Sequence, residues 1–378
     1  MASTFTRPLR LLVVCPSWVG DAVMATPALR LLRSSLPGAF IGGLVRPGID
    51  ELLAGAGFFD EVHVERAEGV MGPKHAAAKV RPRRYDTALL LANSFSSALI
   101  ARLAGVPRRV GYARDARSLL LTDRLEAPRR ADGRWLPIPA LAYYWHAARW
   151  LLDPALPRAP GPALPADARM ELAETPEQAG AATTLLSTLA IPDDAPVAIL
   201  NPGGNNPAKR WPADRYAALA GHLASRHGMT VLVSGSPAEH ELTESIAAGA
   251  AGRRSADGRG GTRSVAGRVT LASLKGLIRR ARLMVTNDTG PRHIGAAFGV
   301  PVVTLFGPTD HRWTTIPAPA GETVLLADPA LPEAEVADDH PERCRVDRIT
   351  LERVVSAAEG LLARAGPPHA ATRGSAAS

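Results

Sequence analysis

The sequence predicts an α/β protein built from two doubly wound parallel-sheet domains. The chain has 378 residues, and at roughly 100 to 200 residues per domain that length suggests two domains with separate cores. Short apolar, β-branched runs alternate with stretches of helical spacing in both halves. A turn rich in Gly, Asn or Asp follows the first strand of each half, where such sheets bind ligands. We therefore expect a ligand cleft between the two domains.

The first half alternates from its start and is assigned to an N-terminal domain, residues 1–170. Strands are expected at 10–15, 39–45, 61–64, 86–92 and 109–111, and helices at 24–36, 49–56 and 96–103. From 126 to 167 the composition shifts to Pro, Ala and Arg, around a helical piece at 140–152, and this stretch is interpreted as interdomain material. The alternation indicates a parallel sheet with helices on both faces.

The second half, residues 171–348, repeats the pattern. Strands are expected at 196–200, 230–234, 283–286 and 302–306, and helices at 216–226, 238–248 and 271–281, with a last amphipathic helix at 349–365. The Gly-, Arg- and Ser-rich stretch 251–267 is interpreted as a mobile loop. The tail at 366–378 has the composition of a disordered segment.

Composition limits the class of protein. Hydrophobic residues make up 46% and charged residues 21% of the chain, and no apolar run approaches the ~20 residues that span a bilayer. The two cysteines, Cys15 and Cys344, and the lack of a signal-peptide core predict a cytosolic protein. A net charge of +8 fits nucleic acid, an anionic membrane face or a phosphorylated substrate. Nucleic acid is the weakest of the three, because aromatic residues are few and no nucleic-acid-binding motif occurs.

The sequence lacks the motifs of several common enzyme classes. There is no Gly-x-Gly-x-x-Gly for dinucleotides, no phosphate-binding Gly-x-x-x-x-Gly-Lys-Ser/Thr and no Gly-x-Ser-x-Gly nucleophile elbow. No Asp-x-Asp occurs, and the ten histidines show no paired spacing, so we expect no metal. A metal-free anion site fits the sequence better.

The stretch 283–299 reads as strand, tight turn and helix. Free N–H groups at the start of such a helix, and its dipole, favour an anion. Asp288 has a plain alternative role as a helix cap. His293 favours a ligand site, because it lies one turn past Thr289 and Gly290 at the same end of the helix.

Two further turns are informative, one after the first strand of each half. Asp21 begins a helix after Ser17-Trp18-Val19-Gly20, and a helix cap and a catalytic carboxylate are equally good interpretations of it. The turn 201–212 has glycines that let backbone amides approach a ligand, and Lys209 is a point charge suited to phosphate. Adjacent Lys and Arg are otherwise usually solvated surface.

Four ordered stretches then resemble a known family: Ser17–Asp21, Asn93–Leu99, Pro207–Pro212 and Asn287–His293. They are similar to the signatures of the ADP-heptose:lipopolysaccharide heptosyltransferases of glycosyltransferase family 9, and the first two favour the type II branch. The resemblance runs from about Leu9 to Leu362. It implies a GT-B fold of two facing Rossmann-like domains, with acceptor on the first and nucleotide sugar on the second. It also implies that the helix at 349–365 packs back on the first domain.

The resemblance also implies residue roles. Asp21 would take the proton from the acceptor hydroxyl while heptose is transferred from ADP-heptose with inversion. The implied donor-binding residues are Asn206, Lys209, Glu239, Asp288, Thr289, Gly290 and His293, with Asp288 near the sugar and Glu239 near the ribose. The implied acceptor-binding residues are Ser17, Trp18, Asn93, Arg109 and Arg114. No cofactor and no metal are expected beyond the substrate. The chain departs from the family at Gly295, where Ala is usual, and in its longer 251–267 loop.

The implied acceptor is the inner core of lipopolysaccharide, an acidic, lipid-anchored saccharide, which the enzyme would meet at the cytoplasmic face of the inner membrane. Seven arginines of the first half are candidates to meet its anionic groups, with ordinary surface as the equal alternative: Arg81, Arg83, Arg84, Arg108, Arg109, Arg114 and Arg117. Two other functions stay open. One is a glycosyltransferase of the same fold with another nucleotide sugar, and the other is a non-catalytic lipopolysaccharide-binding protein.

Overall fold

The computed structural model describes residues 8–161, 163–204 and 206–365. Their contacts divide the chain into two units, one running to Thr175 and taking in Arg312–Pro317, the other made of the rest. The boundary predicted from the sequence lies between residues 170 and 171, and the segment Arg312–Pro317, predicted as part of the second domain, is grouped here with the first unit. The predicted tail, 366–378, lies outside the described residues.

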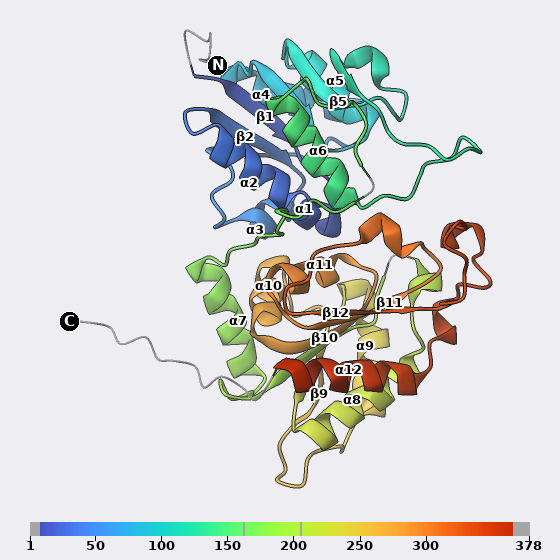
Figure 1. Ribbon diagram of the computed structural model, residues 1–378. Helices are drawn as coiled ribbons and strands as arrows, with labels where there is room; N and C mark the ends of the chain where they lie inside the picture. Colours follow the sequence, from blue (N-terminus) through green and yellow to red (C-terminus); the bar gives the residue numbers. More distant parts are fainter. Residues whose placement is uncertain (1–7, 162, 205, 366–378) are drawn as a thin grey trace. The chain divides into compact units, whose positions relative to one another are not determined.

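The first unit holds a six-stranded parallel sheet (Figure 1). Its strands are β1 (Arg10–Val14), β2 (Phe40–Val45), β3 (Glu61–Val64), β4 (Thr87–Leu90), β5 (Arg108–Tyr112) and β6 (Asp123–Leu125). Its helices are α1 (Val19–Met24), α2 (Thr26–Ser35), α3 (Ile49–Leu53), α4 (Gly72–Val80), α5 (Phe95–Leu103) and α6 (Ala140–Leu152). Helix α6 packs on α1 and α2, so the stretch interpreted as interdomain material supplies a helix of the first unit.

The second unit holds another six-stranded parallel sheet. Its strands are β7 (Val197–Asn201), β8 (Thr230–Val233), β9 (Gly261–Ser264), β10 (Ala281–Asn287), β11 (Val302–Phe306) and β12 (Glu322–Leu326). Its helices are α7 (Pro176–Thr188), α8 (Ala213–His227), α9 (His240–Gly249), α10 (Leu271–Arg280), α11 (Gly290–Ala297) and α12 (Leu351–Ala365). Single 3-10 turns at Pro207–Lys209 and Pro237–Glu239 follow β7 and β8.

Both sheets have the same strand order. The first runs β3-β2-β1-β4-β5-β6 and the second β9-β8-β7-β10-β11-β12, which is the doubly wound Rossmann order. The predicted fold class of two doubly wound parallel domains is thus confirmed. In each sheet the chain reverses its direction of winding between the first and fourth strand, β1 and β4 or β7 and β10. The loops after these four strands diverge and leave room for a ligand, and the predicted site residues can be tested against those four positions.

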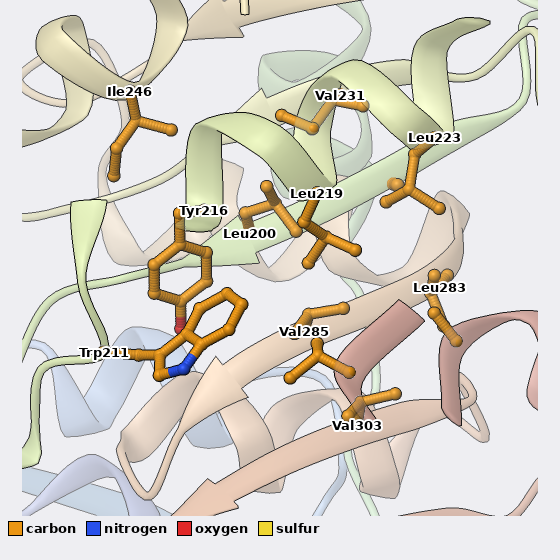
Figure 2. Close-up of a cluster of buried hydrophobic side chains, with 14 of the residues drawn as sticks. Leu200, Trp211, Tyr216, Leu219, Leu223, Val231, Ile246, Leu283, Val285 and Val303 are labelled. Carbon is orange, nitrogen blue, oxygen red and sulfur yellow. The ribbon is translucent and has the colours of Figure 1, made fainter. Parts of the chain in front are cut away.

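The core of the second unit lies between its sheet and helices α8, α9 and α12 (Figure 2). Strand residues such as Leu200 and Val285 face Leu219 and Leu223 of α8, all of them buried. Trp211 and Tyr216 meet edge to face with ring centroids 5.0 Å apart, an arrangement that aromatic rings prefer. Figure 2 shows the two rings next to each other, with Val285 beside the Trp211 ring. This aromatic pair anchors the chain between the β7 turn and α8.

Helix α12 packs on the second unit, whereas the family resemblance leads us to expect that it packs on the first domain. Its buried residues Val354, Ala358 and Leu361 follow helical spacing and belong to the second core. The chain leading into the helix is fixed there too, because Trp211 Nε1 donates to the Ile349 carbonyl at 2.7 Å and Arg215 Nη1 to the same oxygen at 2.8 Å. The apolar stripe was identified correctly, but not the surface that buries it.

The segment 251–267 is not a loop throughout. Its end forms β9, which pairs with β8 at the edge of the second sheet. Only Gly261 of this strand is fully buried, so the sequence carries little of the apolar pattern that identifies a strand. No helix within the described ranges is long and apolar enough to cross a bilayer.

Candidate functional site

Asp21 lies in the first turn of α1, directly beyond the carboxyl end of β1. The N-cap of this helix is Trp18, and no side chain caps it. Asp21 Oδ1 instead accepts a hydrogen bond from the Tyr144 hydroxyl at 2.8 Å. The interpretation of Asp21 as a helix cap therefore fails, and its carboxylate is oriented at the switch point of the first sheet.

Tyr144, from α6, is the partner that holds this carboxylate. Its side chain is buried, and burial followed by the charge of Asp21 raises the pKa of Tyr144 well above its usual value. The phenol thus stays protonated and acts as a donor. Sequence reasoning missed Tyr144, because nothing in a helix of mixed apolar and aromatic residues shows which of them faces Asp21.

Asn93 follows β4, the other strand of the first switch point. Its Oδ1 accepts from Arg117 Nη2 at 2.7 Å. Arg117 also donates to the Tyr112 carbonyl at 3.0 Å, to Ser97 Oγ at 3.0 Å and to the Ala92 carbonyl. Burial lowers the pKa of Arg117 to about 10. The expectation that Arg117 meets acceptor anions is wrong, because its guanidinium is fully buried and organises the loop that presents Asn93.

Three other residues of the predicted acceptor group also lie at this edge. Ser17 and Trp18 precede α1 and are exposed, Trp18 to 66%. Arg114 follows β5, forms an ion pair with Asp115 at 3.1 Å and lies over the Trp135 ring, 4.4 Å from its centroid. A cation over an aromatic face keeps most of its hydrogen-bonding edge available.

Arg109 does not join them. It pairs with Ala88 in the amino-terminal half of β5, away from the carboxyl ends that carry Asp21 and Asn93. Its guanidinium donates to the carbonyls of Leu120 at 2.7 Å and Val106 at 2.6 Å. The sequence singled out Arg109 as an arginine in or beside a loop of the first half, which does not show whether that loop lies at the carboxyl edge of the sheet.

In the second unit, Asn287 connects the two turns of the switch point. Its Nδ2 donates to the carbonyls of Pro202 at 2.7 Å and Gly203 at 3.1 Å, and its Oδ1 accepts from the Tyr216 hydroxyl at 3.1 Å. Asn287 is fully buried at the end of β10. Both turns are therefore fixed relative to each other by one amide side chain.

Glu239 fixes the same turn from the β8 side. Its Oε1 accepts from Gly204 N at 2.8 Å, and its Oε2 closes a capping box with Ser236 N at 2.8 Å and Ser236 Oγ at 2.9 Å. A Cβ on Gly203 would lie 2.2 Å from Glu239 Oε1, so the close approach requires glycine. Burial raises the pKa of Glu239, but the Ser236 and Gly204 hydrogen bonds outweigh it and leave the pKa lowered.

Lys209 and Asp288 form the ionic centre of this site. The Asn206 side chain caps the 3-10 turn through Ala208 N at 3.0 Å, and that turn carries Lys209, whose Nζ lies 3.0 Å from Asp288 Oδ2. Arg292, one turn into α11, approaches Asp288 Oδ1 at 3.5 Å. Burial raises the pKa of Asp288, and the charges of Lys209 and Arg292 together more than compensate, so the net shift is downward.

Arg292 lies within the motif Asn287–His293, but the sequence assigned it no role in the site. Its side chain is buried and pairs in two-pronged fashion with Glu322 of β12, Nε to Oε1 at 2.7 Å and Nη2 to Oε2 at 3.1 Å. Arg292 therefore pairs with Asp288 from the buried side, whereas the Lys209 side chain is more accessible to solvent. Glu322, 30 positions away in the chain, gave no sequence signal.

Thr289 and Gly290 begin α11 at the carboxyl end of β10. Thr289 is the N-cap residue, but its hydroxyl does not cap the helix. The hydroxyl accepts instead from Asn201 Nδ2 at 3.0 Å and lies 3.2 Å from Thr286 Oγ1. The first N–H groups of a helix have no intrahelical acceptors and favour an anion. The predicted strand, turn and helix are thus in place at the switch point.

His293 lies on α11 with its side chain buried. Burial, followed by the charge of Arg292, lowers its pKa to about 3, so the imidazole is neutral at physiological pH. Its Nδ1 is a buried polar atom without a hydrogen-bond partner in the described parts of the chain. An unpaired buried nitrogen costs free energy and is expected to be satisfied by a ligand. His293 therefore serves as a neutral hydrogen-bonding group rather than as a cation.

The arrangement in the second unit can stabilise a diphosphate. It combines a helix N-terminus, the Lys209 ammonium and glycine-rich backbone at the switch point of a parallel sheet. Within the described ranges, the only group of side chains whose ligand atoms converge closely enough for a metal is His222, His227 and Glu359. That group lies on α8 and α12 and includes none of the residues at the switch point.

Comparison with known proteins decides the family. Residues 75–340 match the model of glycosyltransferase family 9 (heptosyltransferase). The chain belongs to glycosyltransferase family 9. A family 9 glycosyltransferase is an enzyme, and the choice of a glycosyltransferase over a binding protein is confirmed.

Individual relatives of this family 9 glycosyltransferase are similar over most of its length. Lipopolysaccharide heptosyltransferase 2 of Salmonella typhimurium is 30% identical over 319 residues, covering 81% of this chain and 85% of that protein. The enzyme of the same name from Escherichia coli K12 is 30% identical over 316 residues, with the same coverage. The structure of ADP-heptose LPS heptosyltransferase II from E. coli superposes with a TM-score of 0.73 at 26% identity, over 94% of this chain and 99% of that one.

Proposed function

We propose that this family 9 glycosyltransferase transfers heptose from ADP-heptose to the inner core of lipopolysaccharide, with inversion, as a heptosyltransferase of type II that adds the second heptose. Relatives named heptosyltransferase 2 match more than four fifths of the chain. The observation that carries the proposal is the ionic centre at the second switch point, where Lys209 and the α11 N-terminus converge around Asp288.

The donor diphosphate is proposed to bind at the N-terminus of α11. Negative charge accumulates on the leaving nucleoside diphosphate as the glycosidic bond breaks, and oriented amides with a nearby cation stabilise it. Lys209 offers three donors, of which Asp288 takes one. The unpaired Nδ1 of His293 and the hydroxyl of Thr289 add neutral contacts, and Asn206 holds the turn that carries Lys209.

Asp288 and Glu239 are proposed to act beside the diphosphate. Asp288 is kept ionised by Lys209 and Arg292, so it can accept hydrogen bonds from sugar hydroxyls. Glu239 uses both oxygens to hold Gly204 and Ser236, and any contact it makes with the ribose is added to that structural role. The glycine turn it fixes is the backbone that would face the nucleotide.

Asp21 is proposed to take the proton from the acceptor hydroxyl as that oxygen attacks the anomeric carbon of heptose. Its carboxylate is oriented by Tyr144. A positioned general base accelerates the reaction by roughly 10²- to 10⁴-fold. Ser17, Trp18, Asn93 and Arg114 at the same edge are proposed to bind the acceptor. Arg109 is not among them, since its guanidinium is held by backbone carbonyls at the other end of β5.

We further propose that the enzyme works in the cytoplasm and meets its lipid-anchored acceptor at the inner face of the inner membrane. The net charge of +8 supports attraction to an anionic surface. Exposed arginines of the first unit, such as Arg81, Arg83 and Arg84, contribute to that charge.

The test is a donor and acceptor profile of the purified enzyme. ADP-heptose should be consumed with a core acceptor that carries one heptose, and products are measured by mass spectrometry. UDP- and GDP-sugars serve as matched donors. Preference for one of those would support the alternative glycosyltransferase, and acceptor binding without turnover of any donor would contradict the proposal. An acceptor without heptose tests the order of addition.

A further inference from the structure

Two histidines and a glutamate converge on the surface of the second unit, away from the switch point. His222 and His227 lie on α8, and Glu359 lies on α12. Glu359 Oε1 is 3.0 Å from His222 Nε2 and 3.8 Å from His227 Nε2. One ligand atom from each residue falls within 4.8 Å of the other two. Two imidazoles and a carboxylate are a common zinc-binding set.

Hydrogen bonding explains only part of this arrangement. His222 at 3.0 Å can donate to Glu359, but a separation of 3.8 Å is too long for a hydrogen bond from His227 to the same oxygen. Zinc with ligands at ~2.0 to 2.2 Å in a tetrahedron places neighbouring ligand atoms roughly 3.4 Å apart. The observed 3.0 and 3.8 Å separations lie on either side of that value, so small side-chain adjustments complete the geometry.

The protonation of His227 is compatible with metal binding. Burial, then the neighbouring His222 and further the charge of Arg226, lower the pKa of His227. This shift favours the neutral ring, whose lone pair a metal ligand needs. Arg226 is exposed, and solvent screens its repulsion of a bound cation.

We infer that His222, His227 and Glu359 form a zinc-binding site that joins α12 to α8. With three protein ligands, the fourth position is left to water. Because the ligands come from two helices far apart in the chain, bound zinc crosslinks the last helix to the core in which Val354, Ala358 and Leu361 are buried. The site is structural and does not depend on the proposed transfer reaction.

Zinc titration of the tag-free full chain by calorimetry tests the site. Metal-stripped protein should bind one equivalent of Zn²⁺, and saturating Zn²⁺ should raise the thermal midpoint by several degrees, since a ligand that binds only the folded state stabilises it. Amide hydrogen exchange in α12 should slow at the same time. His222→Gln, His227→Gln and Glu359→Gln should each weaken binding at least about tenfold.

His340→Asn is the matched control. His340 Nε2 lies 2.6 Å from Glu335 Oε2 in the same unit, and this pair belongs to no metal-ligand group in the described chain. The control should keep wild-type affinity. No saturable binding, or equal weakening by His340→Asn and by the three site variants, would overturn the inference. A failure of the transfer assay would leave these readouts unaffected.

Discussion

Asp21 is the residue whose chemical role is easiest to separate from its structural one. It does not cap α1, and its carboxylate accepts from Tyr144. Asp21→Asn keeps the size and the acceptor oxygen for this bond but removes the proton-accepting charge. We expect turnover to fall by roughly 10²-fold or more, with donor affinity and thermal midpoint almost unchanged. Turnover within about threefold of the wild type would exclude Asp21 as the base.

Lys209 is the accessible cation of the proposed donor site. Its removal should cost on the order of 1.5 to 3 kcal/mol of interaction with a diphosphate, as for hydrogen bonds to charged groups. Lys209→Ala should therefore reduce donor affinity or turnover at least about tenfold, measured by calorimetry with ADP and by steady-state rates. Arg259→Ala is the control, because Arg259 is an exposed cation of the same unit that pairs with Asp257 and touches none of the switch-point residues. The substitution also removes the ion pair between Lys209 and Asp288, which affects stability, so the thermal midpoint of each variant is measured as well.

His293 makes the stability of the second unit depend on pH. Its folded pKa of about 3 lies below the unfolded value of ~6.5, so the unfolded chain binds the extra proton. The stabilising contribution is therefore complete well above pH 6.5 and decreases as pH falls toward the folded pKa, so that about 2 kcal/mol of the high-pH stability is lost at pH 5. Urea unfolding of wild type and His293→Gln at several pH values measures this. Identical pH slopes for the two proteins would contradict the assignment.

At the scale of elements, the contact of α6 with α1 sets the position of Asp21. Tyr144→Phe removes one hydrogen-bond donor and keeps the buried ring. A carboxylate that accepts fewer hydrogen bonds holds its proton more tightly, so the acid limb of the turnover profile should move to higher pH. Tyr85→Phe in the same unit is the control, since the buried Tyr85 hydroxyl contacts His63 Nε2 at 2.7 Å and not Asp21. A uniformly lower rate with an unmoved acid limb would indicate a structural effect only.

The elements also show what the sequence can predict. Buried strands such as β1, β4, β7 and β10 are continuous apolar runs, and the turns after them carry Gly, Asn and Asp, so the sequence alone predicts the switch points. Edge strands β6, β9 and β12 were missed, because each is only partly buried and its pattern is weak. Tyr144, Arg292 and Arg117 depend on long-range contacts, and a local pattern contains no information about those contacts.

At the scale of the whole molecule, we propose that Lys209 and the α11 N-terminus supply the positive charge that stabilises the leaving diphosphate. Excess chelator should therefore leave turnover unchanged at assay temperature, measured with and without added Mg²⁺. It should lower the thermal midpoint only in protein loaded with zinc at His222, His227 and Glu359. Loss of most activity on chelation, restored by Mg²⁺, would mean that the donor site has been misinterpreted.

The burial of α12 in the second core has a consequence for synthesis on the ribosome. Domains fold as units and usually in the order of translation. All six strands of the first sheet and α6 have been synthesised once Leu152 is added, whereas the second core lacks Val354, Ala358 and Leu361 until α12 is made. Until then, the apolar surface of β10 and β11 that α12 covers is open to other chains. We therefore expect the growing chain to be prone to aggregation between the synthesis of β11 and that of α12.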